Sequence, residues 1–153
     1  MQKENKVANQ EIILLAYHVY LYYNGCVWAI PDHFSKGEMT MPFINAKFSA
    51  PVSRDKELEI KSALGEAITL LGKSERYLMV QIQDNCRMYF GGENDKPMAF
   101  FDVSLLHSAP RASYEQLTER LCGIAEEYMG IGGEQVYVKF EETENWGYNS
   151  FMF

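Results

Sequence analysis

The stretch Pro42–Pro51, PFINAKFSAP, contains the pattern from which the fold can be predicted. From Pro42 to Phe48 apolar and polar residues alternate, as they do in a strand with one buried face. The Ser-Ala-Pro that closes the stretch recurs at Ser108–Pro110, and there too it follows a strand-like segment, Pro97–Leu106. The chain from Pro42 onward is therefore predicted to repeat one structural unit.

A helix pattern follows the first Ser-Ala-Pro. Ser53 and Asp55 are candidate helix caps, and Gly72 is a candidate stop. The apolar positions between them recur at helical spacing, at Leu58, Leu64, Ile68 and Leu71. A strand containing tyrosine, Tyr77–Gln83, is expected to complete this unit.

A second helix pattern follows the second Ser-Ala-Pro. Ser113 with Gln116 three residues later resembles a capping box. Gly130 is expected to end the helix, whose apolar stripe is Leu117, Leu121, Ile124, Ala125 and Tyr128. The strand Val136–Phe140 completes the unit, and a further short strand is expected at Arg87–Phe90.

Two β-α-β units give an α+β fold. A crossover helix makes the two strands that it joins parallel and packs on one face of their sheet. We therefore expect a four-stranded mixed sheet with both helices on one face. The other face would expose large apolar side chains, and a patch of that kind usually marks an interface, so we also expect an oligomer.

The composition limits the partners of this chain. Its 153 residues carry a net charge of −7, with 47% hydrophobic and 23% charged residues. These values predict one globular domain and argue against nucleic acid or anionic membrane as partners. Three widely separated cysteines suit a reducing compartment. The histidines His18, His33 and His107 have no metal-ligand spacing, so no metal site is expected.

Residues 12–30 form a run without charged side chains that is long enough to cross a membrane. His18, Asn24 and Gly25 interrupt the run, and four tyrosines stand where leucines would be expected. No small-residue cleavage site follows it. A membrane or export element is therefore the less favoured interpretation of this segment.

Several short motifs follow one another in a specific order. They are Met41-Pro42-Phe43-Ile44, Gly72-Lys73 with Tyr77, Phe90-Gly91-Gly92 with Pro97, Leu121-Cys122-Gly123, Val136-Tyr137-Val138 and Gly147-Tyr148-Asn149-Ser150. In their order and spacing, residues 41–153 resemble the macrophage migration inhibitory factor (MIF) and phenylpyruvate tautomerase family of the tautomerase superfamily. The resemblance implies a homotrimer of paired β-α-β units with active sites at subunit boundaries.

The resemblance implies a cofactor-independent enzyme whose catalytic base is the amine of an N-terminal proline, here Pro42. That amine exists only if the chain is cut after Met41. We therefore divide the chain into an extension, residues 1–41, and a MIF-like domain, residues 42–153. The extension is interpreted as translated upstream sequence or as a non-functional leader. The codons available to Lys36-Gly37-Glu38 include AAGGAG, a bacterial ribosome-binding sequence at a workable distance before Met41.

The resemblance also assigns site residues. Lys73 matches the lysine that binds the substrate carboxylate, although a lysine after a helix is by itself more often a solvated side chain. Leu106 matches a position whose backbone amide helps to bind that carboxylate. Tyr137 matches a tyrosine contributed by the neighbouring subunit, with a simple interface aromatic as the alternative. Phe43 and Tyr148 would line the aromatic mouth, although each is also a plausible core residue.

The sequence departs from the family at several positions that bear on function. Trp146 replaces a small apolar residue beside the pocket and would narrow it. Lys139 stands where the best-known member has an asparagine, and it either strengthens carboxylate binding or shifts ring preference, or else points to solvent. Met98-Ala99-Phe100-Phe101 replaces a Cys-x-x-Cys, so thiol-oxidoreductase activity is not carried over.

The expected function is keto–enol tautomerisation of a phenylpyruvate-like 2-keto acid without a cofactor. The alternative is a cytokine-like binding protein with a vestigial pocket. We expect a small-molecule substrate, a homotrimer and a cytoplasmic location, with non-classical release and a protein receptor left open.

Overall fold

The computed structural model describes residues 41–152. Two β-α-β units follow each other along this part of the chain, and a short hairpin ends it. The elements are β1 (Pro42–Phe48), α2 (Arg54–Ala67), η1 (Ile68–Leu71), η2 (Glu75–Tyr77), β2 (Met79–Gln83), β3 (Ala99–Leu106), α3 (Arg111–Met129), η3 (Gly133–Gln135), β4 (Val136–Thr143), β5 (Gly147–Tyr148) and β6 (Phe151–Met152).

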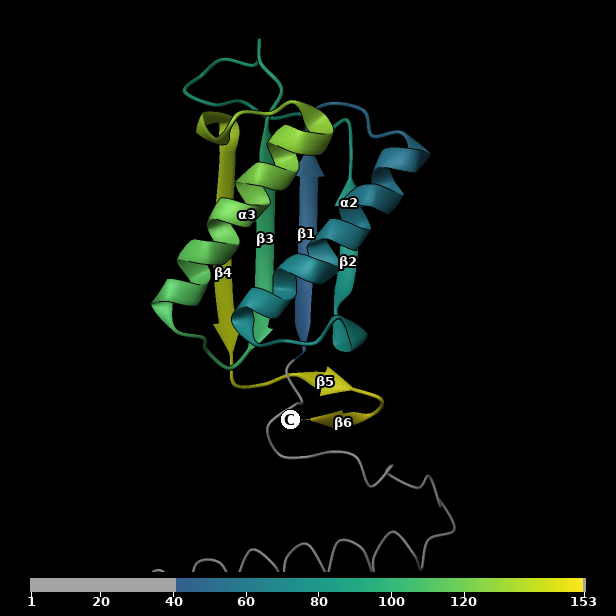
Figure 1. Ribbon diagram of the computed structural model, residues 1–153, viewed down its shortest axis with the longest axis vertical. Coiled ribbons are helices and arrows are strands. Elements are labelled where there is room, and N and C mark those ends of the chain that lie inside the picture. Colours follow the sequence, from purple (N-terminus) through teal and green to yellow (C-terminus); the bar gives the residue numbers. More distant parts are fainter. Residues whose placement is uncertain (1–40, 153) are drawn as a thin grey trace, which may run out of the picture. The chain divides into compact units, whose positions relative to one another are not determined.

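The four long strands form one mixed sheet in the order β2-β1-β3-β4 (Figure 1). β1 pairs in parallel with β2, and β3 in parallel with β4, as crossover helices require. The two units meet where β1 and β3 pair antiparallel, with Pro42 opposite Leu105 and Phe48 opposite Ala99. The predicted fold class is confirmed.

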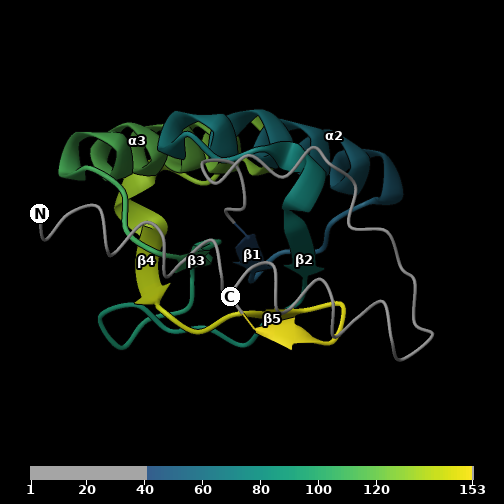
Figure 2. The ribbon, with the colours of Figure 1, turned by 90° about the horizontal axis from the view of Figure 1, so that it is seen from below.

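Both helices cover the same face of the sheet, as Figure 2 shows from below. Alternate strand residues point under the helices, and those of β1 are fully buried: Ile44, Ala46 and Phe48. Phe48 meets Phe101 of β3 edge to face, with the ring centroids 5.9 Å apart. The core therefore lies between the sheet and the helix pair.

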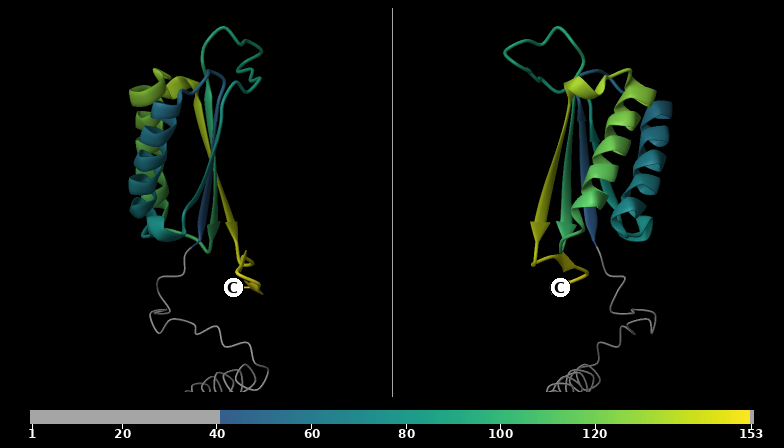
Figure 3. Two further views of the ribbon diagram at one scale, coloured as in Figure 1. Left: turned by 90° about the vertical axis from the view of Figure 1, so that its right-hand side faces the viewer. Right: turned by 60° about the vertical axis from the view of Figure 1, so that its left-hand side comes forward.

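Within the described residues, the other face of the sheet carries no helix (Figure 3). The loop between β2 and β3 and the β5–β6 hairpin project on this side, at opposite ends of the strands. Large exposed apolar side chains belong to this face or to these two projections: Met79, Tyr89, Tyr137, Tyr148, Phe151 and Met152. We call this the open face.

The helix ends confirm some predicted caps and correct another. Ser53 caps α2, and its Oγ accepts a hydrogen bond from the Lys56 amide at 3.4 Å. Gly72 and Gly130 end the two helical segments in the left-handed conformation. The predicted capping box at Ser113 is wrong, because α3 begins at Arg111 with Pro110 as its N-cap, which leaves Ser113 inside the helix.

Three further predictions need correction. Leu58, expected in the core, is 52% exposed on α2. Tyr77 lies in η2, so the second strand begins only at Met79. Arg87–Phe90 is no strand, since Phe90 forms a single bridge with Glu93 across the turn at Gly91 and Gly92.

The predicted extension, residues 1–41, lies outside the described residues except for Met41. The uncharged run 12–30 and residues 36–38 lie in this part of the chain, so the interpretation of the extension stays a prediction. Among residues 41–152, no helix combines the length and the apolar character needed to cross a bilayer.

Candidate active site

Met41 and Pro42 lie at the start of β1, against the end of β3. The amide of Leu106 donates a hydrogen bond to the Met41 carbonyl at 3.3 Å. Met41 is 4% exposed. Because Met41 precedes Pro42 in this chain, the Pro42 nitrogen is an amide without a basic lone pair. The Leu106 amide is therefore already used in a hydrogen bond within the chain.

Lys73 approaches the same place from the end of the first helical segment. It comes directly after Gly72, whose left-handed conformation (φ 67°) turns the chain out of η1. Lys73 is only 6% exposed, and its Nζ donates to the Leu106 carbonyl at 3.2 Å. Burial lowers the pKa of this ammonium below its ordinary value, because a low-dielectric surrounding disfavours the charged form.

Leu106 thus links the start of β1 to Lys73. Its amide contacts residue 41 and its carbonyl contacts Lys73. A buried ammonium and a backbone amide are both donors suited to a carboxylate. An amine at Pro42 would lie beside them. The structure therefore brings three of the predicted residues, Pro42, Lys73 and Leu106, to one end of the sheet.

Two residues beside this point were not found from the sequence. His107 adopts a left-handed backbone (φ 60°) directly after Leu106, and its amide donates to the Thr143 carbonyl at 3.0 Å. Tyr114 of α3 accepts from the Ala109 amide at 2.9 Å and donates to Glu142 of β4. These bonds fix the loop after β3. No motif marks either residue, so only the folded geometry reveals them.

Tyr137 lies far from Pro42 within one chain. It stands opposite Phe100, and Phe100 stands opposite Lys47. This row is five residues along β1 from Pro42, which is about 17 Å at the usual rise of a strand. Tyr137 is 61% exposed on the open face. One chain does not bring it to the Pro42 end.

Lys139 also lies on the open face, but its charge is paired. Its Nζ is 3.2 Å from Asp102 and 2.9 Å from Glu141. The hydrogen bonds to Glu141 and then to Asp102 raise the pKa of Lys139. The side chain is exposed, but within one chain it does not offer an uncompensated cation.

The two predicted mouth residues come from different elements. Phe43 is half-buried on the open face of β1, between Met79 and Ser104. Tyr148 is exposed in β5 of the C-terminal hairpin. One residue belongs to the central sheet and the other to the C-terminal hairpin, and their shared aromatic mouth stays a prediction.

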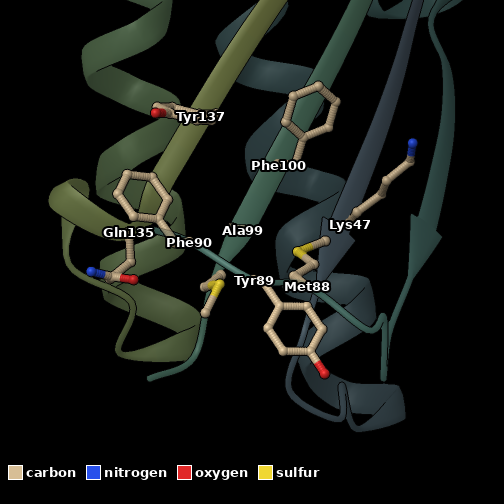
Figure 4. Close-up of a pocket in the computed structure, with 9 residues that line it drawn as sticks. Lys47, Met88, Tyr89, Phe90, Ala99, Phe100, Gln135 and Tyr137 are labelled. Atoms are coloured by element: carbon tan, nitrogen blue, oxygen red, sulfur yellow. The ribbon is translucent and has the colours of Figure 1, made fainter. Parts of the chain in front are cut away.

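A separate hollow lies at the far end of the open face (Figure 4). Its volume is about 250 Å³, and the sheet row Lys47, Phe100 and Tyr137 forms its floor. Tyr89 and Phe90 from the loop between β2 and β3 cover it (Figure 4). Among the described residues, no cluster of His, Cys, Asp and Glu suited to a metal ion occurs.

Comparison with protein families identifies this chain. The family model described as macrophage migration inhibitory factor (MIF) matches residues 41–151. The chain belongs to the MIF family. A comparison with curated proteins gives no significant match.

Solved structures of MIF proteins share this architecture. Leishmania major MIF2 has a TM-score of 0.69 at 25% identity, covering 74% of this chain and 97% of the other. The MIF-like protein of Entamoeba histolytica has 0.67 at 28%, covering 74% and 99%. The homologue from Prochlorococcus marinus has 0.63 at 31%, covering 72% and 98%. These matches span nearly the whole length of each relative.

Proposed function

We propose that this protein is a cofactor-independent keto–enol tautomerase for phenylpyruvate-like 2-keto acids. In the working form the chain begins at Pro42. The prolyl nitrogen takes a proton from the carbon beside the ketone. The resulting prolyl ammonium returns that proton to the enolate oxygen, directly or through water, which gives the enol and the neutral amine. The atoms balance without an oxidant or a metal, and the reverse direction uses the same groups.

Leu106 contacts both Lys73, through its carbonyl, and Met41, through its amide, and this arrangement carries the proposal. Within residues 41–152 Lys73 is buried without a carboxylate partner, and its Nζ donates to the Leu106 carbonyl at 3.2 Å. Burying an ammonium without a counter-ion costs free energy. A bound carboxylate would compensate that charge. A 2-keto acid supplies the missing carboxylate beside the carbon that Pro42 would deprotonate.

Cleavage after Met41 would change two groups at once. It would turn the Pro42 amide into a secondary amine, and it would release the Leu106 amide from the Met41 carbonyl. The base and one carboxylate donor would therefore appear together. An α-amino group has a pKa near ~8, and the neighbouring Lys73 charge would lower that of Pro42 toward neutrality.

The proposal includes a homotrimer in which Tyr137 of one subunit faces Pro42 of the next. Within one chain Tyr137 is too far from Pro42 to contact the same small substrate, because its row lies about 17 Å along β1 from Pro42 and Tyr137 itself lies two strands away on β4. The exposed apolar side chains of the open face support its burial against further copies. Lys139 is paired with Asp102 and Glu141, so it would line the site as a polar side chain and would not bind the substrate carboxylate as a second cation.

The test begins with protein expressed untagged from its own upstream region. Intact mass is expected to correspond to Pro42–Phe153. The enol–keto rate of phenylpyruvate is then measured for the wild type, Pro42→Gly and Lys73→Ala. We expect kcat/KM to fall for Pro42→Gly by up to the ~10²–10⁴-fold that a positioned base contributes. Unchanged rates in both variants would favour a binding protein with a vestigial pocket.

A further inference from the structure

The Phe-Gly-Gly-Glu segment forms a tight turn. Gly91 and Gly92 have φ of 60° and 93°, a combination typical of a type I′ two-residue turn. The Phe90 amide donates to the Glu93 carbonyl at 2.8 Å, and the Glu93 amide donates back at 3.0 Å. The backbone of Phe90 is thereby fixed without any help from its ring.

The Phe90 ring is directed at Tyr137. Their centroids are 5.0 Å apart at an interplanar angle of 49°, and Figure 4 shows Phe90 crossing from the loop to lie beside Tyr137. Within residues 41–152 the Tyr137 hydroxyl makes no hydrogen bond, and this side chain is largely exposed. Within one chain, the ring contact with Phe90 therefore restricts the orientation of this side chain.

We propose that Phe90 is a positioning residue for substrate binding across the subunit boundary. It holds Tyr137 of its own chain in the orientation that meets the ring of the substrate bound by Pro42 and Lys73 of the neighbouring subunit. This inference rests on the proposed function. It assigns a role to Phe90, which would otherwise be an aromatic residue in a surface loop.

The structure separates this role from simple packing. Phe90 is not a member of the buried core, and the loop that carries it is held by its own turn hydrogen bonds. Loss of the ring should therefore leave the fold intact and release only Tyr137. Aromatic pairs contribute an energy equivalent to about 2- to 12-fold in a binding constant.

The test compares Phe90→Leu, Phe90→Tyr and Tyr137→Leu in protein expressed from the native start region. We expect Phe90→Leu to raise KM for phenylpyruvate about 2- to 12-fold with a smaller change in kcat. Phe90→Tyr, which keeps the ring, should restore the wild-type KM. In the Tyr137→Leu background, Phe90→Leu should add no further increase.

Tyr89→Leu is the matched control, since Tyr89 lies in the same loop and covers the same hollow, whereas the ring that contacts Tyr137 is that of Phe90. Its KM should stay at the wild-type value. Two results would overturn the role of Phe90 without contradicting the proposed function. One is an equal rise of KM on Phe90→Leu with and without Tyr137, and the other is a change in oligomeric size measured by light scattering. A wild type that lacks activity would overturn the proposed function and this inference with it.

Discussion

Lys73 is the residue at which stability and the proposed function would oppose each other. Its ammonium is buried and donates to a neutral carbonyl. Burial disfavours the charged form, whereas binding of a carboxylate requires that form. A buried ammonium is therefore unfavourable for folding, and this one lies near the start of β1. Such a group is typical of a functional site.

The first prediction concerns substrate binding by Lys73. Lys73→Met keeps an unbranched side chain, one heavy atom shorter, and removes the charge. A hydrogen bond to a charged group contributes about 1.5–3 kcal/mol, so KM for phenylpyruvate should rise about 10- to 150-fold. Lys61→Met is the control, since Lys61 is exposed on α2 and pairs with Glu75, and its KM should not change. Equal KM values for the two variants would contradict the clamp role.

The second prediction concerns the pH dependence of stability. The pKa of Lys73 is lowered by burial in the folded state, whereas the unfolded chain keeps the ordinary value of 10.5. Below the folded pKa both states are protonated and the penalty is full. Between the two pKa values the unfolded state holds more protons, so stability rises with pH and the penalty is gone above 10.5.

The measurement is the free energy of unfolding in denaturant from about pH 7 to about pH 11, a range that brackets the expected rise. The difference between wild type and Lys73→Met should rise with pH in this window. Taking the difference removes other groups, such as Cys122, whose pKa is raised by burial and which acts in the opposite sense. A flat or falling difference would show that Lys73 is not desolvated in solution.

At the scale of elements, two helical segments end in the same way. Gly72 and Gly130 both adopt a left-handed conformation, and a Cβ at either position would meet no atom within 4 Å. A substitution there changes only the backbone preference. The two positions differ in their next residue along the chain, because only Gly72 precedes a predicted site residue, Lys73.

The third prediction uses this matched pair. Gly72→Ala and Gly130→Ala should each lower the free energy of unfolding by about 1 kcal/mol, because a left-handed L-residue costs roughly that much. Only Gly72→Ala should also raise KM, by about fivefold if a similar energy is lost at Lys73. Denaturant unfolding and phenylpyruvate kinetics measure the two effects. An equal rise of KM in both variants would indicate general loosening of the fold.

The sequence predicted those elements whose local pattern agrees with their tertiary environment. Pro42–Phe48 alternates and is buried on one side, so the predicted bounds of this strand equal the observed bounds of β1. Ser113 failed as a cap because Pro110, with its fixed φ, already starts α3 three residues earlier. Arg87–Phe90 has strand-forming residues but no strand of the described chain beside it, since Gly91 and Gly92 return the chain at once.

The site shows the same limit. Pro42, Lys73 and Leu106 were assigned through the family resemblance, and the structure places them at one end of the sheet. His107 could not be predicted, because its left-handed backbone is set by the bond of its amide to Thr143 and not by its residue type. The pairing of Lys139 with Asp102 depends on sheet register, which single-strand patterns do not specify.

At the scale of the whole molecule, the open face explains why the site looks incomplete in one chain. Pro42 and Lys73 lie at one end of the sheet, and Tyr137 lies toward the other, with a hollow beside it. A head-to-tail arrangement of copies brings opposite ends together, and closure of that arrangement gives a ring. In the proposed homotrimer, a site at each boundary would draw its base and its carboxylate-binding lysine from one chain and its aromatic wall from the next.

This arrangement predicts that two defective chains can restore each other. Pro42→Gly lacks the proline base but keeps Tyr137, and Tyr137→Leu keeps the base but lacks the wall. If the two are unfolded together, mixed and refolded at equal amounts, about one quarter of the boundaries should pair an intact base with an intact wall. The mixture should then show about that fraction of wild-type activity, above the average of the two separate proteins. A mixture that only equals that average, although light scattering and mass analysis show mixed oligomers, would place the complete site within one chain.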